Sequence, residues 1–285
     1  MNGEEVFTEL PWFYTGLAAY MLATLLAVYG VVRARSGPAG AAVTRTYESA
    51  VLLLITAGVL LLTISLAVRW LRIGHGPFVN LFELLISQLF SLGLVYAIAY
   101  WRLPVIRPTA VVVMPVLLLM GAWVLMIEPV DSAYPPTYYN KWLWAHVGFG
   151  KFFLAFCLVG AGLAGIILMR GIQRLAPFFR SLPPDKVLDH LAWRFMILAL
   201  IFDSLMLIAG AVWAQDAWGR YWAWDALETS SFLNWLFIGA ALHARLTYRI
   251  PIRVGALAII GIFVFAFFTY FGTPFVSEAA HKGVI

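Results

Sequence analysis

The sequence predicts an all-α fold, a polytopic transmembrane helical bundle of about eight spans with both termini on the outer side of the membrane. Of its 285 residues, 63% are hydrophobic and only 12% are charged, and the mean hydropathy is +0.89. So few charges are atypical of soluble domains. The apolar residues also fall into continuous runs, and a helix needs about 20 of them to cross a bilayer. The short alternating segments of a transmembrane barrel do not occur in the sequence.

Eight apolar runs are long enough to span, at 12–33, 50–70, 80–101, 107–127, 143–169, 193–214, 227–246 and 253–272. The first follows the acidic MNGEEVFTEL, which lacks the basic region of a cleavable signal peptide. Glu83 opens the third run, and Asp225 and Glu228 open the seventh, where carboxylates favour the helix dipole. The sixth contains Asp203, a charge that needs a partner or a cavity within lipid.

Positive charges in the loops set the expected orientation. The loops after the odd-numbered runs carry 13 Lys and Arg residues, and the opposite side carries five. Because Lys and Arg collect in cytoplasmic loops, the termini and the Trp-rich segment 215–228 are expected outside. The net charge of +5 therefore reflects topology. It indicates a lipid bilayer as the surrounding partner and no nucleic acid.

The runs form a single integral membrane domain over residues 1–285. The loop 128–142 and the tail 273–285 are expected to cap a site on the outer side, and 170–192 is expected to be an amphipathic inner segment. Cys157 is the only cysteine and lies within a span. That excludes an internal disulfide, a CxxCH attachment site and a thiolate metal cluster within this chain.

The Trp-rich segment contains WGRYWAWD at residues 218–225. If it is helical, one face carries four residues at i, i+3, i+4 and i+7 spacing, namely Trp218, Tyr221, Trp222 and Asp225. Arg220 and Trp224 then point elsewhere. Such a face is either an aromatic belt at headgroup depth or a shelf for a large flat apolar ligand. The density of aromatic residues favours the shelf.

Two histidines are expected on the same side as this shelf, His146 at the start of the fifth span and His281 in the C-terminal tail. Each alone is typical of a solvated interfacial residue. As a pair beside an aromatic shelf they also fit the two axial ligands of a haem iron, with the shelf beneath the porphyrin.

His243 lies about 22 Å along the seventh span from Glu228, which places it in the inner half of the bilayer. A histidine within a span indicates function, although the nearby Arg245 also fits an interfacial position. One histidine is half of a bis-histidine site, so a partner subunit would supply the second. His190 is expected to be solvated in the inner loop.

His75 belongs to the segment GHGPFVNLFE, which also contains Asn80 and Glu83. Gly74, Gly76 and Pro77 indicate a structured turn. A structural or gating role is favoured here over iron ligation.

With these residues assembled, the chain resembles the CcsA/ResC cytochrome c biogenesis proteins, the WWD-domain haem-handling family of the system II pathway. The resemblance covers most of the chain and is carried by WAQDAWGRYWAWDALETSSFLNWL, ALHAR and GHGPFVNLFE. The order of His146, the Trp-rich segment, His243 and His281 is also that of the family. One departure is Ala226-Leu227, where the family has Pro-Lys.

The resemblance implies the haem-handling subunit of a holocytochrome c synthase (a haem lyase) in the bacterial cytoplasmic membrane or the thylakoid membrane. Haem b would rest at a membrane site on His243 and then move to an outer or luminal site held by His146 and His281. There it would be presented for thioether attachment to the CxxCH thiols of apocytochrome c. The implied partners are apocytochrome c, a CcsB/ResB-type membrane subunit and a thiol-reducing protein.

The haem-contacting residues implied in this way are His146, His243, His281, Trp218, Arg220, Tyr221, Trp222, Trp224 and Asp225, and Arg220 would pair with a propionate. No catalytic residue is expected beyond those that position haem. Two alternatives are a non-catalytic haem chaperone and a membrane electron carrier with b-type haem. The electron carrier is disfavoured, because such proteins usually pair histidines within their spans.

Overall fold

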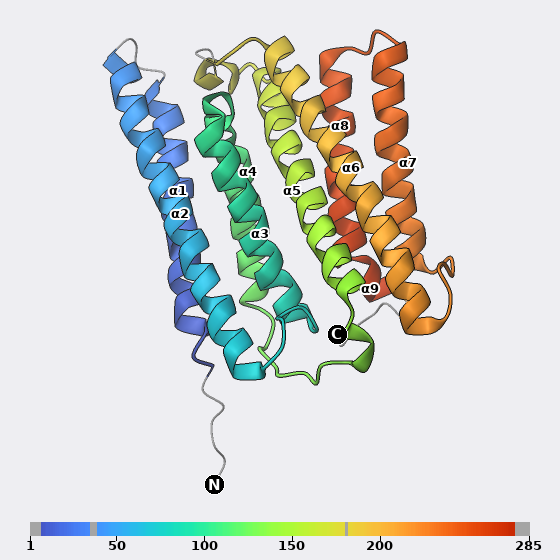
Figure 1. Ribbon diagram of the computed structural model, residues 1–285. Coiled ribbons are helices and arrows are strands. Elements are labelled where there is room, and N and C mark those ends of the chain that lie inside the picture. The colour runs from blue at the N-terminus through green and yellow to red at the C-terminus, as the bar shows by residue number, and fades with distance from the viewer. Residues whose placement is uncertain (1–6, 35–38, 180–181, 277–285) are drawn as a thin grey trace. The chain divides into compact units, whose positions relative to one another are not determined.

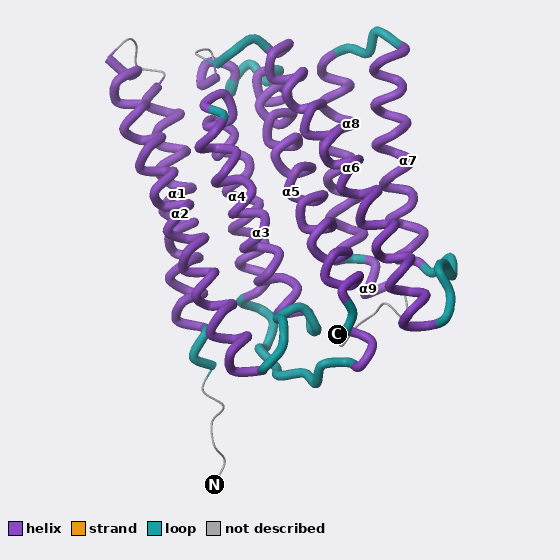
Figure 2. The backbone as a smooth tube through the Cα atoms, in the orientation of Figure 1, coloured by secondary structure: helices purple, strands orange, loops and turns teal. Residues whose placement is uncertain are grey.

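A computed structural model describes residues 7–34, 39–179 and 182–276, and those residues form helices and connecting loops (Figures 1 and 2). The long helices are, in chain order, α1 (Leu10–Ala34), α2 (Ala39–Ile73), α3 (Leu81–Arg102), α4 (Ala110–Val124), α5 (Lys141–Arg170), α6 (Asp185–Trp218), α7 (Ala226–Thr247) and α8 (Ile252–Phe271). Four short elements accompany them, η1 (Pro104–Thr109), η2 (Pro136–Tyr138), η3 (Ala176–Phe179) and α9 (Thr273–Val276).

The predicted fold class is confirmed, since a helix covers most of each of the eight apolar runs. Seven of the described helical stretches are long and apolar enough to cross a membrane. The exception is α7, because its polar residues lower the mean hydropathy of the helix. These residues include Glu228, Ser230, Ser231, Asn234, His243 and Arg245. The chain is therefore an integral membrane protein, while the side on which its termini lie stays a prediction.

The described residues group into two compact units. Unit 1 contains α1, α2, α3, the part of α4 from Met114 and the loop up to Tyr134, and unit 2 contains residues 103–113 and the chain from Pro135. The prediction of one membrane domain over the whole chain is not tested by this grouping.

Small residues bring the helices of unit 1 together. A Cβ atom added at Gly58 of α2 would lie 2.3 Å from the Tyr20 ring of α1, and one at Gly93 of α3 would lie 1.8 Å from the Tyr20 hydroxyl. Tyr20 is fully buried as a result. Close approach of this kind is how transmembrane helices associate, because lipid provides no hydrophobic drive between them.

Unit 2 is an antiparallel arrangement in which α6 and α8 pack on α5, and α7 packs on α6 and α8. One end of the unit, here called the site end, therefore gathers the start of α5, the end of α6, the start of α7 and the end of α8 (Figure 1). The opposite end is closed by Arg170, which donates hydrogen bonds to the carbonyls of Phe179, Leu182 and Pro183 and pairs with Asp185.

The segment 170–192 differs from the expected amphipathic segment. α6 begins at Asp185, so the polar DKVLDH run forms the first turns of that helix. The reason is an ion pair between Asp189 of α6 and Arg245 of α7, which keeps these turns folded against the unit. With 34 residues α6 is about 51 Å long, longer than the hydrocarbon core of a bilayer.

Substituting Gly58 by Ala should lower the thermal unfolding midpoint of the detergent-solubilised protein, because the new methyl group displaces the Tyr20 ring. Overpacking of this kind costs about 1–3 kcal/mol. Gly261→Ala in α8 is the matched control, since nothing lies within 4 Å of its Cβ position. An unchanged midpoint for Gly58→Ala would contradict the close packing of α1 on α2.

Candidate functional site

His146 lies in the second turn of α5 at the site end of unit 2. Its Nδ1 atom is 2.9 Å from the carbonyl oxygen of Met206 in α6. A carbonyl only accepts, so Nδ1 carries the proton and donates, and the ring's basic lone pair is on Nε2. In metal-binding histidines this same bond to a backbone carbonyl fixes the tautomer and leaves the opposite nitrogen as ligand.

Two further contacts fix the orientation of this ring. Gly210 gives it room, because a Cβ there would lie 2.6 Å from Nδ1. On one side the ring of Trp213 stacks against His146, with centroids 6.1 Å apart and planes 23° from parallel. Trp213 is held in turn by a hydrogen bond from its Nε1 to the Thr137 carbonyl at 3.0 Å. The imidazole is therefore positioned by α6 and by the loop before α5.

The helical shelf predicted for WGRYWAWD is wrong. α6 ends at Trp218, and Gly219 takes the left-handed conformation with φ +72°, which ends helices in this way. Residues 219–225 form a loop, and Asp225 then caps α7. Trp218 and Trp222 consequently do not lie on one helix face.

The aromatic residues form two clusters instead. In the first cluster Trp213, which stacks on His146, also contacts two other rings edge-on. Its ring centroid lies 4.9 Å from that of Trp218 and 5.9 Å from that of Tyr138. Burial raises the pKa of Tyr138. The first cluster thus places indole and phenol rings beside the imidazole.

The second cluster lies at the start of α7. Trp222 and Trp224 meet edge to face at 5.7 Å, each contacts Phe232 at 6.3 and 6.2 Å, and Phe232 stacks on Trp235. Trp224 is 68% exposed and the neighbouring Tyr221 is 60% exposed, so this aromatic surface is open. The Nε1 atom of Trp222, by contrast, is buried without a hydrogen-bond partner among the described residues.

Backbone hydrogen bonds hold the loop between the clusters. Asp225 Oδ1 accepts from the Glu228 N–H at 2.8 Å, and Glu228 Oε2 accepts from the Ala223 N–H at 2.6 Å. Between them Trp224 adopts φ +60°, a left-handed conformation that is uncommon for a bulky residue. The Asp225 carboxylate expected at the edge of a shelf is thus a helix cap, and Arg220 lies exposed in the loop.

His243 lies near the opposite end of unit 2, about 25 Å along α7 from Ala226. The ring is exposed, and its Nε2 is 3.5 Å from the Thr247 hydroxyl of the next turn. It is thus well separated from His146 within the unit. His281 and the tail after residue 276 lie outside the described residues, so the expected meeting of His146 and His281 stays a prediction.

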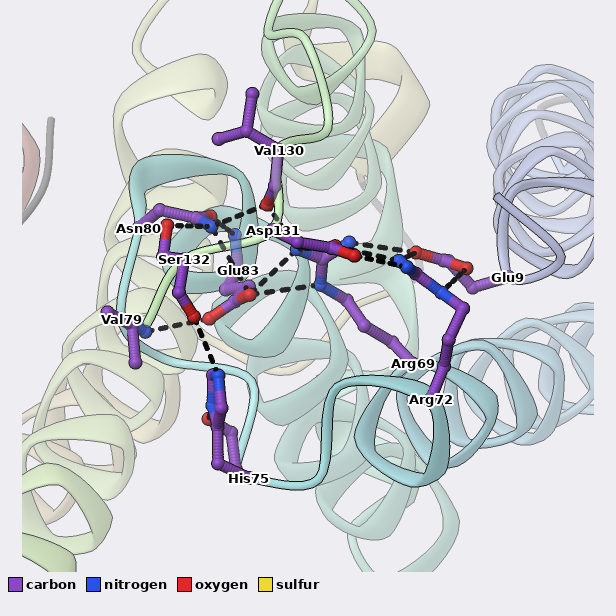
Figure 3. A network of polar contacts seen from close by, with 11 residues as sticks. Glu9, Arg69, Arg72, His75, Val79, Asn80, Glu83, Val130, Asp131 and Ser132 are labelled. Carbon is purple, nitrogen blue, oxygen red and sulfur yellow. Dashed lines mark hydrogen bonds and ion pairs between the residues drawn. The ribbon is translucent and has the colours of Figure 1, made fainter. Parts of the chain in front are cut away.

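Unit 1 contains His75, Asn80 and Glu83, and Figure 3 shows the polar network around them. Both ring nitrogens of His75 face carbonyl oxygens, Nε2 that of Ser132 at 2.9 Å and Nδ1 that of Gly76 at 3.1 Å. The ring also stacks on Tyr134 at 4.8 Å. These contacts favour the structural interpretation of His75 over iron ligation.

The centre of this network is Arg69, which is fully buried. It donates to Glu9 at 2.8 Å, to Glu83 at 2.7 Å and to the Val130 carbonyl at 2.6 Å, and so connects the start of α1, α2, α3 and the loop after α4 (Figure 3). Asn80 caps α3 by accepting from the Glu83 N–H at 2.9 Å. Arg69 was not among the site residues predicted from the sequence, although an arginine at the end of an apolar run is a signal for such pairing.

Arg72 completes the network on its exposed side by binding both Glu9 and Asp131. Burial alone would raise the pKa of Glu9, but hydrogen bonds from Arg72 and Arg69 hold that pKa below its usual range. The hydrogen bond from Arg72 likewise lowers the pKa of Asp131.

The fold and site define a polytopic membrane protein that presents an oriented imidazole beside an aromatic cluster at one end of the helices of unit 2. Residues 78–281 match the family described as cytochrome C assembly protein. The chain belongs to this family.

Relatives with known roles agree with this assignment. The cytochrome c biogenesis protein CcsA of Prochlorococcus marinus (strain MIT 9312) is 30% identical over 254 residues, covering 78% of this chain and 81% of that protein. CcsA of Chlamydomonas reinhardtii is 30% identical over 234 residues, covering 78% and 65%. The solved structure of the cytochrome c heme lyase CcmF shares the fold with a TM-score of 0.60 at 17% identity. It is matched over 96% of this chain, which spans about half, 52%, of CcmF.

Replacing Arg69 by Met should destabilise unit 1 by about 3–5 kcal/mol, because Glu9 and Glu83 would remain buried without their cation. Denaturant unfolding in detergent measures the change. Arg102→Met, at an exposed arginine of the same unit, is the control. Equal stability of the two variants would show that the buried pairs do not hold the unit together.

The lowered pKa values of Glu9 and Asp131 predict acid sensitivity. A carboxyl with a depressed folded-state pKa stabilises the fold above its unfolded-state pKa, and this contribution is lost as the pH falls through the folded-state pKa. The thermal midpoint should therefore decline below about pH 4. In Asp131→Asn the thermal midpoint should be lower at pH 7 and should decline less on acidification. Glu128→Gln, at an exposed carboxyl of the same loop, is the control and should follow the wild type. Parallel curves for wild type and Asp131→Asn would refute this assignment.

Proposed function

We propose that this protein is the haem-handling subunit of a cytochrome c synthase and that the site end of unit 2 presents haem b for attachment to apocytochrome c. The observation that carries the proposal is the bond from His146 Nδ1 to the Met206 carbonyl, because it prepares Nε2 as an iron ligand. Membership of the cytochrome C assembly protein family supports the same reading.

The residues present fit a haem group. His146 and, from the tail, His281 would hold the haem iron. The two aromatic clusters would contact the porphyrin faces and edge, and the buried Nε1 of Trp222 is a donor in need of an acceptor such as a propionate oxygen. Arg220 is an exposed cation in the same loop and suits the second propionate.

The chemistry that haem supplies is the reactivity of its vinyl groups toward the two thiols of a CxxCH motif, each thiol adding across one vinyl group to form a thioether. The protein's own contribution is orientation and exclusion of other reactions. The fixed imidazole sets the position of the iron, and the exposed rings of Tyr221 and Trp224 form the surface that apocytochrome c approaches. His243, exposed on α7, would hold haem at the membrane site, with a CcsB/ResB-type subunit supplying the second histidine and a thiol-reducing protein keeping the CxxCH thiols reduced.

The visible spectrum of the purified protein with its partner subunit tests the ligand assignment. His146→Ala should weaken haem binding at least about tenfold and alter the bis-histidine bands, because it removes an axial nitrogen. His190→Ala, at an exposed histidine of α6, is the control and should behave like the wild type. Identical spectra and haem content in the two variants would remove His146 from the site.

The same preparation separates a synthase from a haem chaperone. A synthase converts an apocytochrome c carrying CxxCH into a product with covalent haem, and it does not do so with AxxAH. Haem retention without a covalent product would favour the chaperone.

A further inference from the structure

Asp203 differs from the other buried carboxylates in the described part of the chain. It lies midway along α6 with no exposed surface, and neither carboxylate oxygen has a hydrogen-bond partner. The others accept from arginine side chains or from backbone N–H groups, and they are Glu9, Glu83, Asp189 and Glu228. Burying a carboxylate in this way is costly unless it is paired or protonated.

No ion pair to Asp203 occurs among the described residues, Lys151 of the packed helix α5 included. Its titratable neighbours are Cys157 of α5 and Tyr270 of α8, whose ordinary pKa values lie above neutral pH. From α7, Trp235 donates to the adjacent Ser204 and has no titratable group. The neutral carboxyl is therefore the form that suits this position.

One face of α6 leads from this carboxyl to the proposed iron ligand. Asp203, Met206 and Gly210 are spaced i, i+3 and i+7 and so lie along one face of α6. The Met206 carbonyl accepts a hydrogen bond from His146 Nδ1. The sulfur atom of Met206 accepts one from the Tyr270 hydroxyl at 3.0 Å. Gly210 contacts the His146 ring from the next turn, about 10 Å along the helix axis from Asp203.

A charge at the iron would interact electrostatically with Asp203 across this interior. The interaction between two charges grows as the effective dielectric falls, and little water screens groups packed between α5, α6 and α8. A positive charge added at His146 favours an ionised carboxyl nearby, whereas a neutral centre leaves the proton in place.

We propose that Asp203 is a proton-binding site coupled to the oxidation state of the iron held by His146, an inference that rests on the proposed function. With ferrous iron the carboxyl keeps its proton. If bound ferrous haem gave one electron to a mediator of a redox titration, the Asp203 O–H bond would break, the proton would leave to solvent and a carboxylate would remain. One electron and one proton depart together, so the net charge of the site is conserved.

Redox titration of the haem-loaded protein between about pH 6 and 9 tests this coupling. The wild-type midpoint potential should fall with rising pH, with a slope approaching about 59 mV per unit for one proton per electron. Asp203→Asn should lose most of that slope, while Cys157→Ser, at a buried neighbour, should keep it. Haem propionates titrate in all three proteins, so the difference isolates Asp203. An unchanged slope in Asp203→Asn would overturn the proposal.

An infrared measurement on the haem-free protein separates this inference from the proposed function. A buried protonated carboxyl gives a C=O stretching band that Asp203→Asn must remove, and its absence in the wild type would overturn the assignment of a neutral Asp203. If haem binds independently of His146, the proposed function fails and the coupling with it, whereas the infrared band still reports on Asp203 itself.

Discussion

The scarcity of water around membrane-embedded groups is the constraint on which this structure depends. A charged group there has to pair with an opposite charge in the protein or become neutral by gaining or losing a proton. Arg69 satisfies this requirement with two buried carboxylates, and the ends of α1, α2 and α3 are fixed around it as a consequence. Within unit 2, at the end opposite the site end, Arg245 and Asp189 meet the same requirement by forming an ion pair, which joins α7 to α6.

The same constraint acts on the candidate site in a milder form. An imidazole at the end of a membrane helix has to direct its N–H toward an acceptor, and His146 uses the Met206 carbonyl for that purpose. The bond places the basic lone pair of the ring on Nε2. Asp203 of α6 has no hydrogen-bond partner among the described residues, and in our proposal it meets the requirement by protonation.

Features that depend on local sequence could be predicted, and those that depend on distant contacts could not. The apolar runs fixed the number and approximate bounds of the helices, because span length is set by bilayer thickness. The shared face considered for WGRYWAWD in a helical conformation does not form, because Gly219 ends α6 in a left-handed conformation that the sequence alone does not predict. The pairing of Arg69 with Glu9 joins residues 60 positions apart, and the spacing of residues within a helix does not predict so distant a contact.

Histidine positions were recognisable from the sequence, but their environments were not. His146 was identified as a candidate ligand, while the carbonyl that selects its tautomer comes from α6, 60 residues further along the chain. For His75 a structural or gating role was already favoured from the turn residues around it, and its two nitrogens both face carbonyl oxygens within unit 1. The difference between a candidate ligand and a structural residue thus lies in which groups surround the ring.

The turn at Gly219 has a mechanical consequence. It assigns the two aromatic clusters to different helices, since Trp213 and Trp218 are carried by α6 and Phe232 and Trp235 by α7. A rigid planar molecule that contacted both clusters would connect the end of α6 to the start of α7 and restrict their independent motion.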